Sequence, residues 1–393
     1  MNQEISFIFD VIGAQLKNET LPKVPQNLDW DKVYKIAKAH NILNIIAYGI
    51  KKGDYNPDEE LFKKFLQSLY TSLIVDENQK RDFSVLFDAF SKNDIKFLPL
   101  KGIVLKPIYP SPDMRNMSDG DILIDIADRD KIEKLMESLG YTFIKESNHE
   151  LIYQKPPFTN VELHKILVPS YNEDLYAYYG DGWDRAKKRE TSQRYEMSTE
   201  DTFIYIITHF AKHYRDGGAG IKYIIDIWLY KNSYDIDMDY VLTEMKKMNL
   251  EKFTLCLLKL TRVWFEGEAT DDLTLSMTQY IIGSGQYGSM KNATLVGTMR
   301  ENQEKSGKEV AKRGLLYLLF PNFSHMKRNY PVLRKAPYLI PFLWIWRWIR
   351  IVVGKTDRKN IKRASYLSKQ NVAEFDAHMK ALGLDIYNGR KQS

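Results

Sequence analysis

Two aspartates separated by one glycine carry the clearest chemical signal in the sequence. Asp119-Gly120-Asp121 precedes the apolar run Ile122–Ile124, which predicts a strand that enters a core with the carboxylates at its exposed end. Because alternate side chains of a strand share a face, the two carboxylates would lie roughly 6–7 Å apart along the chain. Such a pair repels itself unless a cation lies between, and hard oxygen ligands suit Mg²⁺. The pair therefore predicts a magnesium site, against the plainer alternative of an Asp-Gly surface turn.

Two flanking segments strengthen the magnesium hypothesis. Upstream, Lys101-Gly102 follows a short apolar run, so a glycine turn would close a buried strand and offer backbone N–H groups and a positive charge to a phosphate. Downstream, Glu162 and His164 alternate on another predicted strand and therefore share one face. A third carboxylate from a neighbouring strand would complete a metal site, although most single glutamates on strands are simply solvated.

These motifs fall where the hydrophobic period of the sequence changes. Residues 30–90 place apolar side chains three and four residues apart, which predicts helices. From residue 95 the apolar runs are short and end at glycine or polar residues, as in strands, with one amphipathic helix predicted over 127–139. The predicted strands lie within residues 95–102, 119–126, 141–146, 150–155 and 160–167. Beyond residue 170 helical periodicity returns.

The predicted fold class is α+β, with a small mixed β-sheet domain between helical segments. The N-terminal helical segment covers residues 1–84, the sheet domain residues 85–170, and a helical C-terminal region residues 171–393. Within that last region, residues 327–363 contain eleven Lys and Arg and one Asp, a net charge of +10, whereas the whole chain carries +6. The positive charge is therefore local.

The composition is that of a folded protein from a reducing compartment. Hydrophobic residues make up 44% and charged residues 27% of the 393 positions, which argues against disorder. The single cysteine, Cys256, cannot form an internal disulfide, and no secretory signal is predicted, so a cytoplasmic location is expected. The apolar run 336–346 is too short for a transmembrane span of about 20 residues. A buried helix with basic flanks is favoured there over a helix lying on an anionic membrane surface.

Two further polar features occur in the predicted C-terminal helices. His209 and His213 are four residues apart and share a helical face, but they lack the glutamate of a metalloprotease motif. Asp226 lies in an apolar run, where an unpaired charge would be costly, and Lys222 is the predicted local partner.

Taken together, the motifs resemble one protein family. The stretch from Leu98 to Phe143, followed by Val161–Leu167, is similar to the bacterial uncharacterised nucleotidyltransferases of the polymerase-β-like superfamily. The resemblance is strongest over residues 85–170 and continues more weakly through the helices that follow. It implies transfer of a nucleoside monophosphate from a nucleoside triphosphate to a hydroxyl, with release of pyrophosphate and two Mg²⁺ ions as cofactors.

The resemblance also implies a role for individual residues. Asp119 and Asp121 match the paired metal-binding aspartates and Glu162 the third carboxylate, and these three are the predicted catalytic and metal-binding residues. Lys101-Gly102 matches the phosphate-holding turn, which in the wider superfamily usually carries Gly-Ser. The residues predicted to contact the nucleotide are Lys101, Gly102, Arg115, Ser118, His164 and His213.

The acceptor is left open by these motifs. A small-molecule or sugar-type hydroxyl is the favoured acceptor, because the aromatic-rich helical half could form the wall of a cleft. The first alternative is modification of a protein or a tRNA, with the basic segment 327–363 as the binding surface. The second is a catalytically silent nucleotide-binding module, against which the presence of all three carboxylates argues.

Overall fold

Two compact units make up the described part of the chain. The computed structural model describes residues 2–53, 55–190, 192–300, 316, 320–323, 326–327, 330–353 and 365–386. The first unit comprises Met1–Lys212 and Ala219–Gln286, and the second comprises His213–Gly218 and Tyr287–Tyr387. Helices, a five-stranded mixed sheet and a two-stranded hairpin form the first unit, so the predicted α+β class is confirmed.

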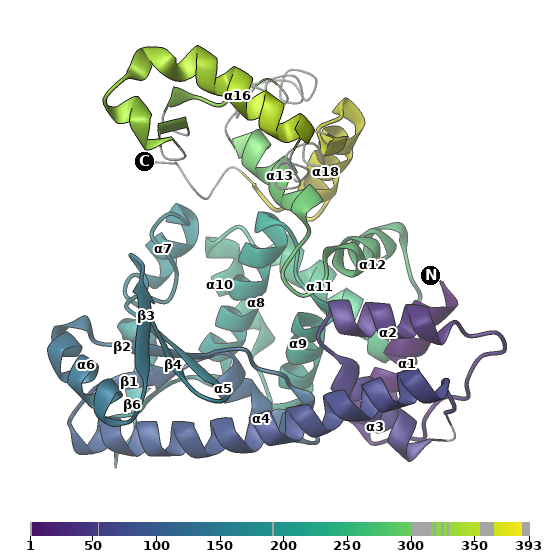
Figure 1. Cartoon of the computed structure of the whole chain (residues 1–393). Helices are drawn as coiled ribbons and strands as arrows, with labels where there is room; N and C mark the ends of the chain where they lie inside the picture. Colours follow the sequence, from purple (N-terminus) through teal and green to yellow (C-terminus); the bar gives the residue numbers. More distant parts are fainter. Residues whose placement is uncertain are drawn as a thin grey trace. The chain divides into compact units, whose positions relative to one another are not determined.

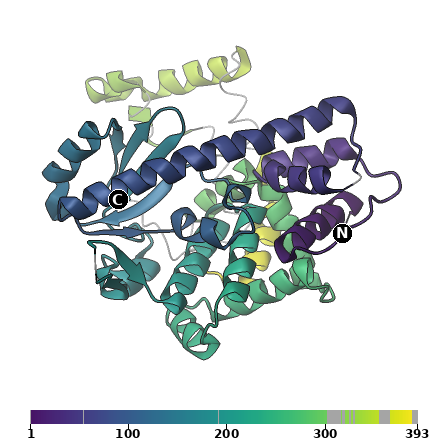
Figure 2. The same cartoon turned by 90° about the horizontal axis from the view of Figure 1, so that it is seen from below.

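Four helices open the first unit (Figure 1). They are α1 (Gln3–Lys17), α2 (Trp30–Ala39), α3 (Leu43–Lys52) and α4 (Glu59–Lys92). The side chain of Asp58 caps α4 by accepting a hydrogen bond from the Leu61 N–H at 3.0 Å. Helix α4 is 34 residues long and continues through residue 84, so it connects the N-terminal helices with the sheet (Figure 2).

A five-stranded mixed sheet follows α4. Its strands are β1 (Phe97–Pro99), β2 (Gly120–Ile124), β3 (Thr142–Glu146), β4 (Glu150–Lys155) and β5 (Thr159–His164). Their spatial order is β1-β2-β5-β4-β3. Strands β2 and β5 are parallel, whereas the other neighbouring pairs are antiparallel. Short helix α5 (Gly102–Leu105) follows β1, and α6 (Arg129–Ser138) follows β2.

One face of this sheet is buried against helices. Phe83 and Phe90 of α4 and Ile132 of α6 form a single apolar core with Ile122 of β2 and Val161 of β5. Because successive side chains of a strand point to opposite faces, Asp121, Glu162 and their alternating neighbours face away from α4. The core thus fixes the orientation of the carboxylates.

The rest of the first unit is mainly helical. It contains α7 (Glu173–Tyr179), α8 (Thr199–Asp216), α9 (Ile221–Ser233), α10 (Met238–Lys247), α11 (Glu251–Phe265) and α12 (Asp272–Ser284). A two-stranded hairpin of β6 (Ala186–Lys188) and β7 (Tyr195–Met197) interrupts the predicted helical region. Its strands have three residues each and lack apolar alternation, so periodicity could not predict them.

The described part of the second unit contains three longer helices. These are α13 (Met290–Arg300), α16 (Ile340–Val353) and α18 (Lys369–Ala381), with short 3₁₀ helices at Pro331–Arg334 and Pro337–Leu339. The predicted basic segment 327–363 is described only in part, because residues 328–329 and 354–364 lie outside the described residues. No helix within the described ranges combines the length and apolar character needed to cross a membrane.

Candidate active site

The turn after β1 places a lysine at the edge of the sheet. Lys101 has a φ of 46° and a ψ of −114°, a conformation that costs a non-glycine residue about 1–3 kcal/mol. Close packing requires the following glycine, because a Cβ at Gly102 would lie 2.5 Å from Met117 Sδ and 2.7 Å from an Arg115 Nη. The constrained turn brings Lys101 Nζ within 2.6 Å of Asp121 Oδ1.

Asp121 and Glu162 lie opposite each other on neighbouring parallel strands. The register pairs Asp121 of β2 with Glu162 of β5, and Leu123 with His164. His164 Nε2 lies 2.8 Å from Asp121 Oδ1 and 3.8 Å from Glu162 Oε2. One ligand atom from each of Asp121, Glu162 and His164 lies within 4.8 Å of the other two, so this group could hold a cation. Carboxylates suit Mg²⁺ and Mn²⁺, whereas imidazole is a more usual ligand of Zn²⁺.

Close packing requires a glycine between the two aspartates. A Cβ at Gly120 would lie 2.0 Å from Phe83 Cζ, so a side chain there would collide with α4. Gly120–Ile124 is a wholly buried strand, and the alternative of an Asp-Gly surface turn is therefore wrong. Asp119 lies on the bend that precedes this strand and is half-buried.

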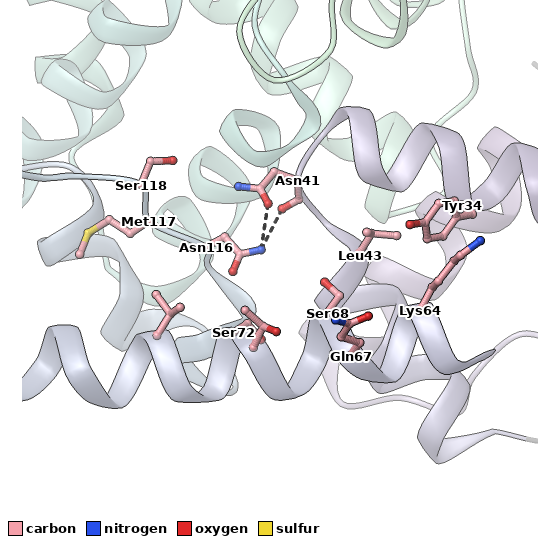
Figure 3. A pocket seen from close by; sticks show the side chains of 12 residues that line it. Tyr34, Asn41, Leu43, Lys64, Gln67, Ser68, Ser72, Asn116, Met117 and Ser118 are labelled. Atoms are coloured by element: carbon pink, nitrogen blue, oxygen red, sulfur yellow. Dashed lines mark hydrogen bonds between the residues drawn. The ribbon is translucent and has the colours of Figure 1, made fainter. Parts of the chain in front are cut away.

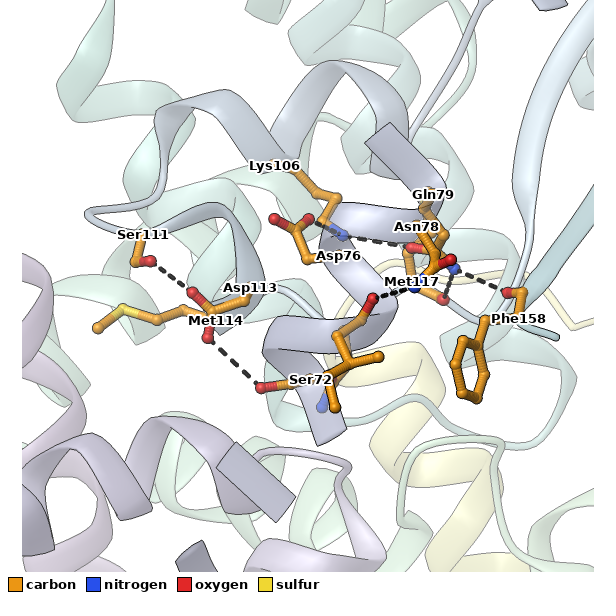
Figure 4. Close-up of polar contacts among 12 residues, drawn as sticks. Ser72, Asp76, Asn78, Gln79, Lys106, Ser111, Asp113, Met114, Met117 and Phe158 are labelled. Carbon is orange, nitrogen blue, oxygen red and sulfur yellow. Dashed lines mark hydrogen bonds and ion pairs between the residues drawn. The ribbon is translucent and has the colours of Figure 1, made fainter. Parts of the chain in front are cut away.

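Polar side chains of α4 fix the loop that leads into Asp119. Gln79 Nε2 donates to the Met117 carbonyl at 2.9 Å and to the Phe158 carbonyl at 3.4 Å. Lys106 Nζ lies 2.5 Å from Asp76 Oδ1 and donates to Gln79 Oε1 at 3.3 Å (Figure 4). These contacts anchor both ends of the segment between α5 and β2.

Burial and crowding perturb the carboxylates unequally. Burial, together with the charges of Asp119 and Asp121, raises the pKa of Glu162 to about 8. Burial and the charge of Asp121 also raise the pKa of Asp119. Although burial acts in the opposite direction, the charge of Lys101 and a hydrogen bond from His164 hold the pKa of Asp121 well below its usual range. Carboxylates that repel one another in this way would be stabilised by a cation among them.

His164 positions Asp121 in this arrangement. Burial and the charge of Lys101 lower the pKa of His164, so the ring is neutral near pH 7. Because an ionised carboxylate only accepts hydrogen bonds, the His164 Nε2 carries the proton that Asp121 accepts. The same nitrogen cannot ligate a metal while it carries that proton. The predicted contact of His164 with the nucleotide stays a prediction.

Sequence patterns did not indicate the second lysine of the site. Lys222 of α9 donates to the Asn116 carbonyl at 3.2 Å, and its charge acts on the pKa of Asp119. Burial and the charge of Arg115 lower the pKa of Lys222 to about 8. The sequence signal for Lys222 is its position one helical turn before Asp226, and that spacing predicts an ion pair and no role in the site.

Asp226 pairs with a different residue. Arg115 Nε and Nη2 donate to the two carboxylate oxygens of Asp226 at 2.7 and 2.8 Å, and the Tyr109 hydroxyl donates to Oδ1 at 2.7 Å. The predicted Asp226–Lys222 pair is therefore wrong. Arg115 is only 5% exposed and ties the loop before β2 to α9. Its predicted contact with a triphosphate stays a prediction.

The remaining predicted residues have separate environments. Ser118 is exposed, and its carbonyl accepts a hydrogen bond from Asn160 Nδ2 at 2.9 Å. The His209 ring lies 6.2 Å from the Tyr205 ring and 5.9 Å from the Tyr223 ring. His213 lies in the last turn of α8 and belongs to the second unit. The roles of Ser118 and His213 in nucleotide binding are not tested by these positions.

Comparison with known proteins yields one match. A family model described as uncharacterised nucleotidyltransferase matches residues 26–266, which is more than half of the chain. The matched range includes every sheet strand, the carboxylates and Lys222. No curated protein and no solved structure matches the chain.

Proposed function

The chain belongs to the uncharacterised nucleotidyltransferase family, and from this premise we propose that it transfers a nucleoside monophosphate from a nucleoside triphosphate to a hydroxyl group with the help of Mg²⁺. One observation carries the proposal. Three carboxylates, from Asp119, Asp121 and Glu162, influence one another on and beside the neighbouring strands β2 and β5, next to the Lys101 turn. This arrangement has the charge and the ligand types that a Mg²⁺-bound triphosphate requires.

The donor set fits the cofactor of the proposal. Asp119, Asp121 and Glu162 would hold the two Mg²⁺ ions, because their mutual repulsion favours a bound cation and their oxygens are ligands that Mg²⁺ accepts. When bound, these ions neutralise charge on the attacking and leaving oxygens. Lys101 and Lys222 add two positive charges, and we assign them to the phosphates of the nucleotide.

The reaction is an in-line displacement at the α-phosphorus. The bond between the acceptor oxygen and phosphorus forms while the bond from phosphorus to the bridging oxygen of pyrophosphate breaks. Cations held among the three carboxylates would keep Glu162 ionised, and its carboxylate oxygen would then accept the hydroxyl proton and pass it to solvent. His164 holds Asp121 in place through the 2.8 Å contact between Nε2 and Oδ1.

Substitution of the carboxylates tests this function. The protein is incubated with each α-labelled triphosphate, Mg²⁺ and a cell extract, and the label is followed into small-molecule, protein and RNA fractions. Asp119→Asn and Asp121→Asn should each reduce transfer at least a thousandfold and leave the unfolding temperature nearly unchanged. Asp125→Asn is the matched control, because Asp125 follows β2 and caps the next turn, a role that asparagine also fills.

The same experiment separates the acceptor classes. We favour a small-molecule or sugar-type hydroxyl, so the label should enter the small-molecule fraction. Label in the protein or RNA fraction would instead favour the macromolecular alternative. Unchanged turnover in Asp119→Asn or Asp121→Asn would overturn the catalytic assignment, and absence of transfer by the wild-type chain would favour the silent module.

A further inference from the structure

A polar pocket lies beside the loop that leads into Asp119. Its volume is about 380 Å³, at the small end of the range of about 300–1,000 Å³ that is typical of small-molecule sites. Ser118, which directly precedes Asp119 in the chain, is one of the lining residues, and consecutive Cα atoms are about 3.8 Å apart, so the lining extends to within one residue of the proposed metal site. The pocket is thus placed to hold a reactant.

Helix α4 supplies one wall of the pocket. Lining residues of α4 recur at intervals of three and four, so they occupy one helical face. This face carries the amide of Gln67 and the hydroxyls of Ser68 and Ser72 (Figure 3). Thr71 also lines the pocket and adds a third hydroxyl. Among the described residues, the side chains of Gln67, Ser68 and Thr71 have no protein hydrogen-bond partner, so they can bind a ligand.

Hydrogen bonds of Asn116 hold the opposite wall of the pocket and connect this wall with the carboxylate site. Asn116 Nδ2 donates to Asn41 Oδ1 at 3.1 Å and to Asn44 Oδ1 at 3.0 Å. The Asn116 carbonyl accepts from Lys222 Nζ at 3.2 Å. Lys222 therefore contacts the wall of the pocket and acts electrostatically on Asp119.

The chemistry of the walls selects the ligand class. None of the described residues that line the pocket is acidic, and the one lysine among them, Lys64, already pairs with Glu60. The only aromatic side chain among the described lining residues is Tyr34, whose ring already packs nearly perpendicular to that of Phe65, with centroids 5.5 Å apart. A flat nucleobase binds best between apolar or aromatic walls. Hydroxyls and amides instead match a ligand that carries many hydroxyl groups.

We propose that this pocket binds the acceptor, and that the acceptor is a sugar-type or other polyhydroxylated small molecule. The inference rests on the proposed function and deepens it. One hydroxyl of the bound molecule reaches the carboxylate site beyond Ser118, forms the bond to the α-phosphorus as pyrophosphate leaves, and gives its proton to Glu162.

Leucine substitutions on α4 test the pocket. Ser68→Leu and Thr71→Leu fill the cavity and keep helix propensity high. Tyr70→Leu is the matched control, because Tyr70 lies on the same turn, is 52% exposed and does not line the pocket. Saturation-transfer NMR with D-glucose, glucose 1-phosphate and adenosine measures binding, and the extract assay measures transfer.

We expect saturation transfer to the sugars in the wild-type chain and the Tyr70→Leu variant, with at least a tenfold loss in Ser68→Leu and Thr71→Leu. Transfer of label should fall by a similar factor while the binding of the triphosphate with Mg²⁺ is kept. Unchanged label transfer in both leucine variants, or a signal from adenosine alone, would overturn the acceptor assignment. Failure of the wild-type chain to bind any triphosphate would instead contradict the proposed function.

A second, independent feature is an exposed apolar face on α16. Phe342, Ile345, Trp346 and Ile349 recur at three- and four-residue intervals and are 49–67% exposed. On the other face, the rings of Trp344 and Trp348 pack edge-on against Phe320, with centroids 5.4 and 4.9 Å away. The predicted buried helix is therefore buried on one face only.

Charge indicates what this face binds. Arg334, Lys335 and Arg350 are exposed near α16, and no acidic residue occurs between residues 327 and 353. Aromatic and apolar side chains flanked by cations match the interface of an anionic bilayer, whose negative surface attracts nearby Lys and Arg side chains. We infer that the α16 face, consisting of Phe342, Ile345, Trp346 and Ile349, binds an anionic membrane surface.

Vesicle sedimentation with the full chain tests this inference. The protein should sediment with phosphatidylcholine vesicles that contain 30% phosphatidylserine, and not with pure phosphatidylcholine. Phe342→Ser with Trp346→Ser should weaken binding at least tenfold. Val332→Ser is the control, since Val332 is 47% exposed in the same unit outside α16. The membrane assignment would be overturned if the wild-type chain did not bind the anionic vesicles or if the double variant bound them equally well. It would also be overturned if the wild-type chain bound tRNA and the double variant did not.

Discussion

Lys222 shows how much of the site depends on single side chains far apart in the sequence. It lies on α9, about a hundred residues after the aspartates whose charge it balances, and its contact with the Asn116 carbonyl fixes its position. No spacing rule joins these residues, because the loop before β2 and the helix α9 meet through tertiary contacts, among them the Arg115–Asp226 pair.

Removal of this lysine should affect nucleotide binding. Charged hydrogen bonds contribute about 1.5–3 kcal/mol, which corresponds to roughly a tenfold to hundredfold change. We expect Lys222→Met to raise the KM for the triphosphate at least tenfold. Lys231→Met, on the same helix, is the control and should leave the KM unchanged. Equal KM values for Lys222→Met and the wild-type enzyme would exclude Lys222 from phosphate binding.

Gly120 determines how closely α4 packs against β2. The glycine lets α4 approach β2 so closely that Phe83 occupies the space of a side chain. The Asp121 carboxylate beside Gly120 is thereby turned away from this core and toward Lys101 and His164. A surface turn would not have given the two aspartates a common orientation.

The approach of α4 to β2 can be tested by adding one methyl group. Gly120→Ala should destabilise the fold by about 1–3 kcal/mol, because overpacking forces backbone or Phe83 to move. Gly283→Ala is the matched control, since a Cβ at Gly283 of α12 meets nothing within 4 Å and alanine favours the helix. Urea unfolding should show a loss for the first variant and a gain of up to about 1 kcal/mol for the second. An unchanged free energy of unfolding in Gly120→Ala would contradict the close packing of Phe83 against Gly120.

At the scale of the first unit, His40 joins three helices. It follows α2 and contacts the Ile282 carbonyl of α12 through Nε2 at 3.2 Å, while Nδ1 accepts from the Ile221 N–H of α9 at 3.2 Å. Burial lowers the pKa of His40 from 6.5 to about 4. The folded unit therefore holds a neutral imidazole under mildly acidic conditions.

This buried histidine should make stability depend on pH. In the unfolded chain the His40 imidazole becomes protonated below about pH 6.5, whereas in the folded chain it stays neutral down to about pH 4. The free energy of unfolding therefore falls as the pH falls through this interval. Between pH 7 and pH 5 we expect His40 to lower the free energy of unfolding by about 2 kcal/mol. His40→Gln keeps polar atoms without a titrating group, and its urea midpoint should vary less with pH. Parallel pH profiles for the two proteins would contradict this origin of the acid sensitivity.

Some properties followed from the sequence alone. The change in hydrophobic period predicted the α+β class, and the strand predicted over 150–155 coincides with β4. The order of the Lys-Gly turn, the paired aspartates and Glu162 indicated the family that the comparison confirms. These signals are local, because alternation, capping and turn residues act within a few positions. The cytoplasmic location stays a prediction.

Other properties required the tertiary structure. It paired Asp226 with Arg115, brought Lys222 to the aspartates, and formed the pocket between α4 and the Asn116 loop. It also divided α16 into a packed and an exposed face. Each of these depends on side chains that meet across many residues of chain, and their partners are chosen by packing and burial. Sequence therefore determined which chemical groups are available, and the fold decided which of them act together.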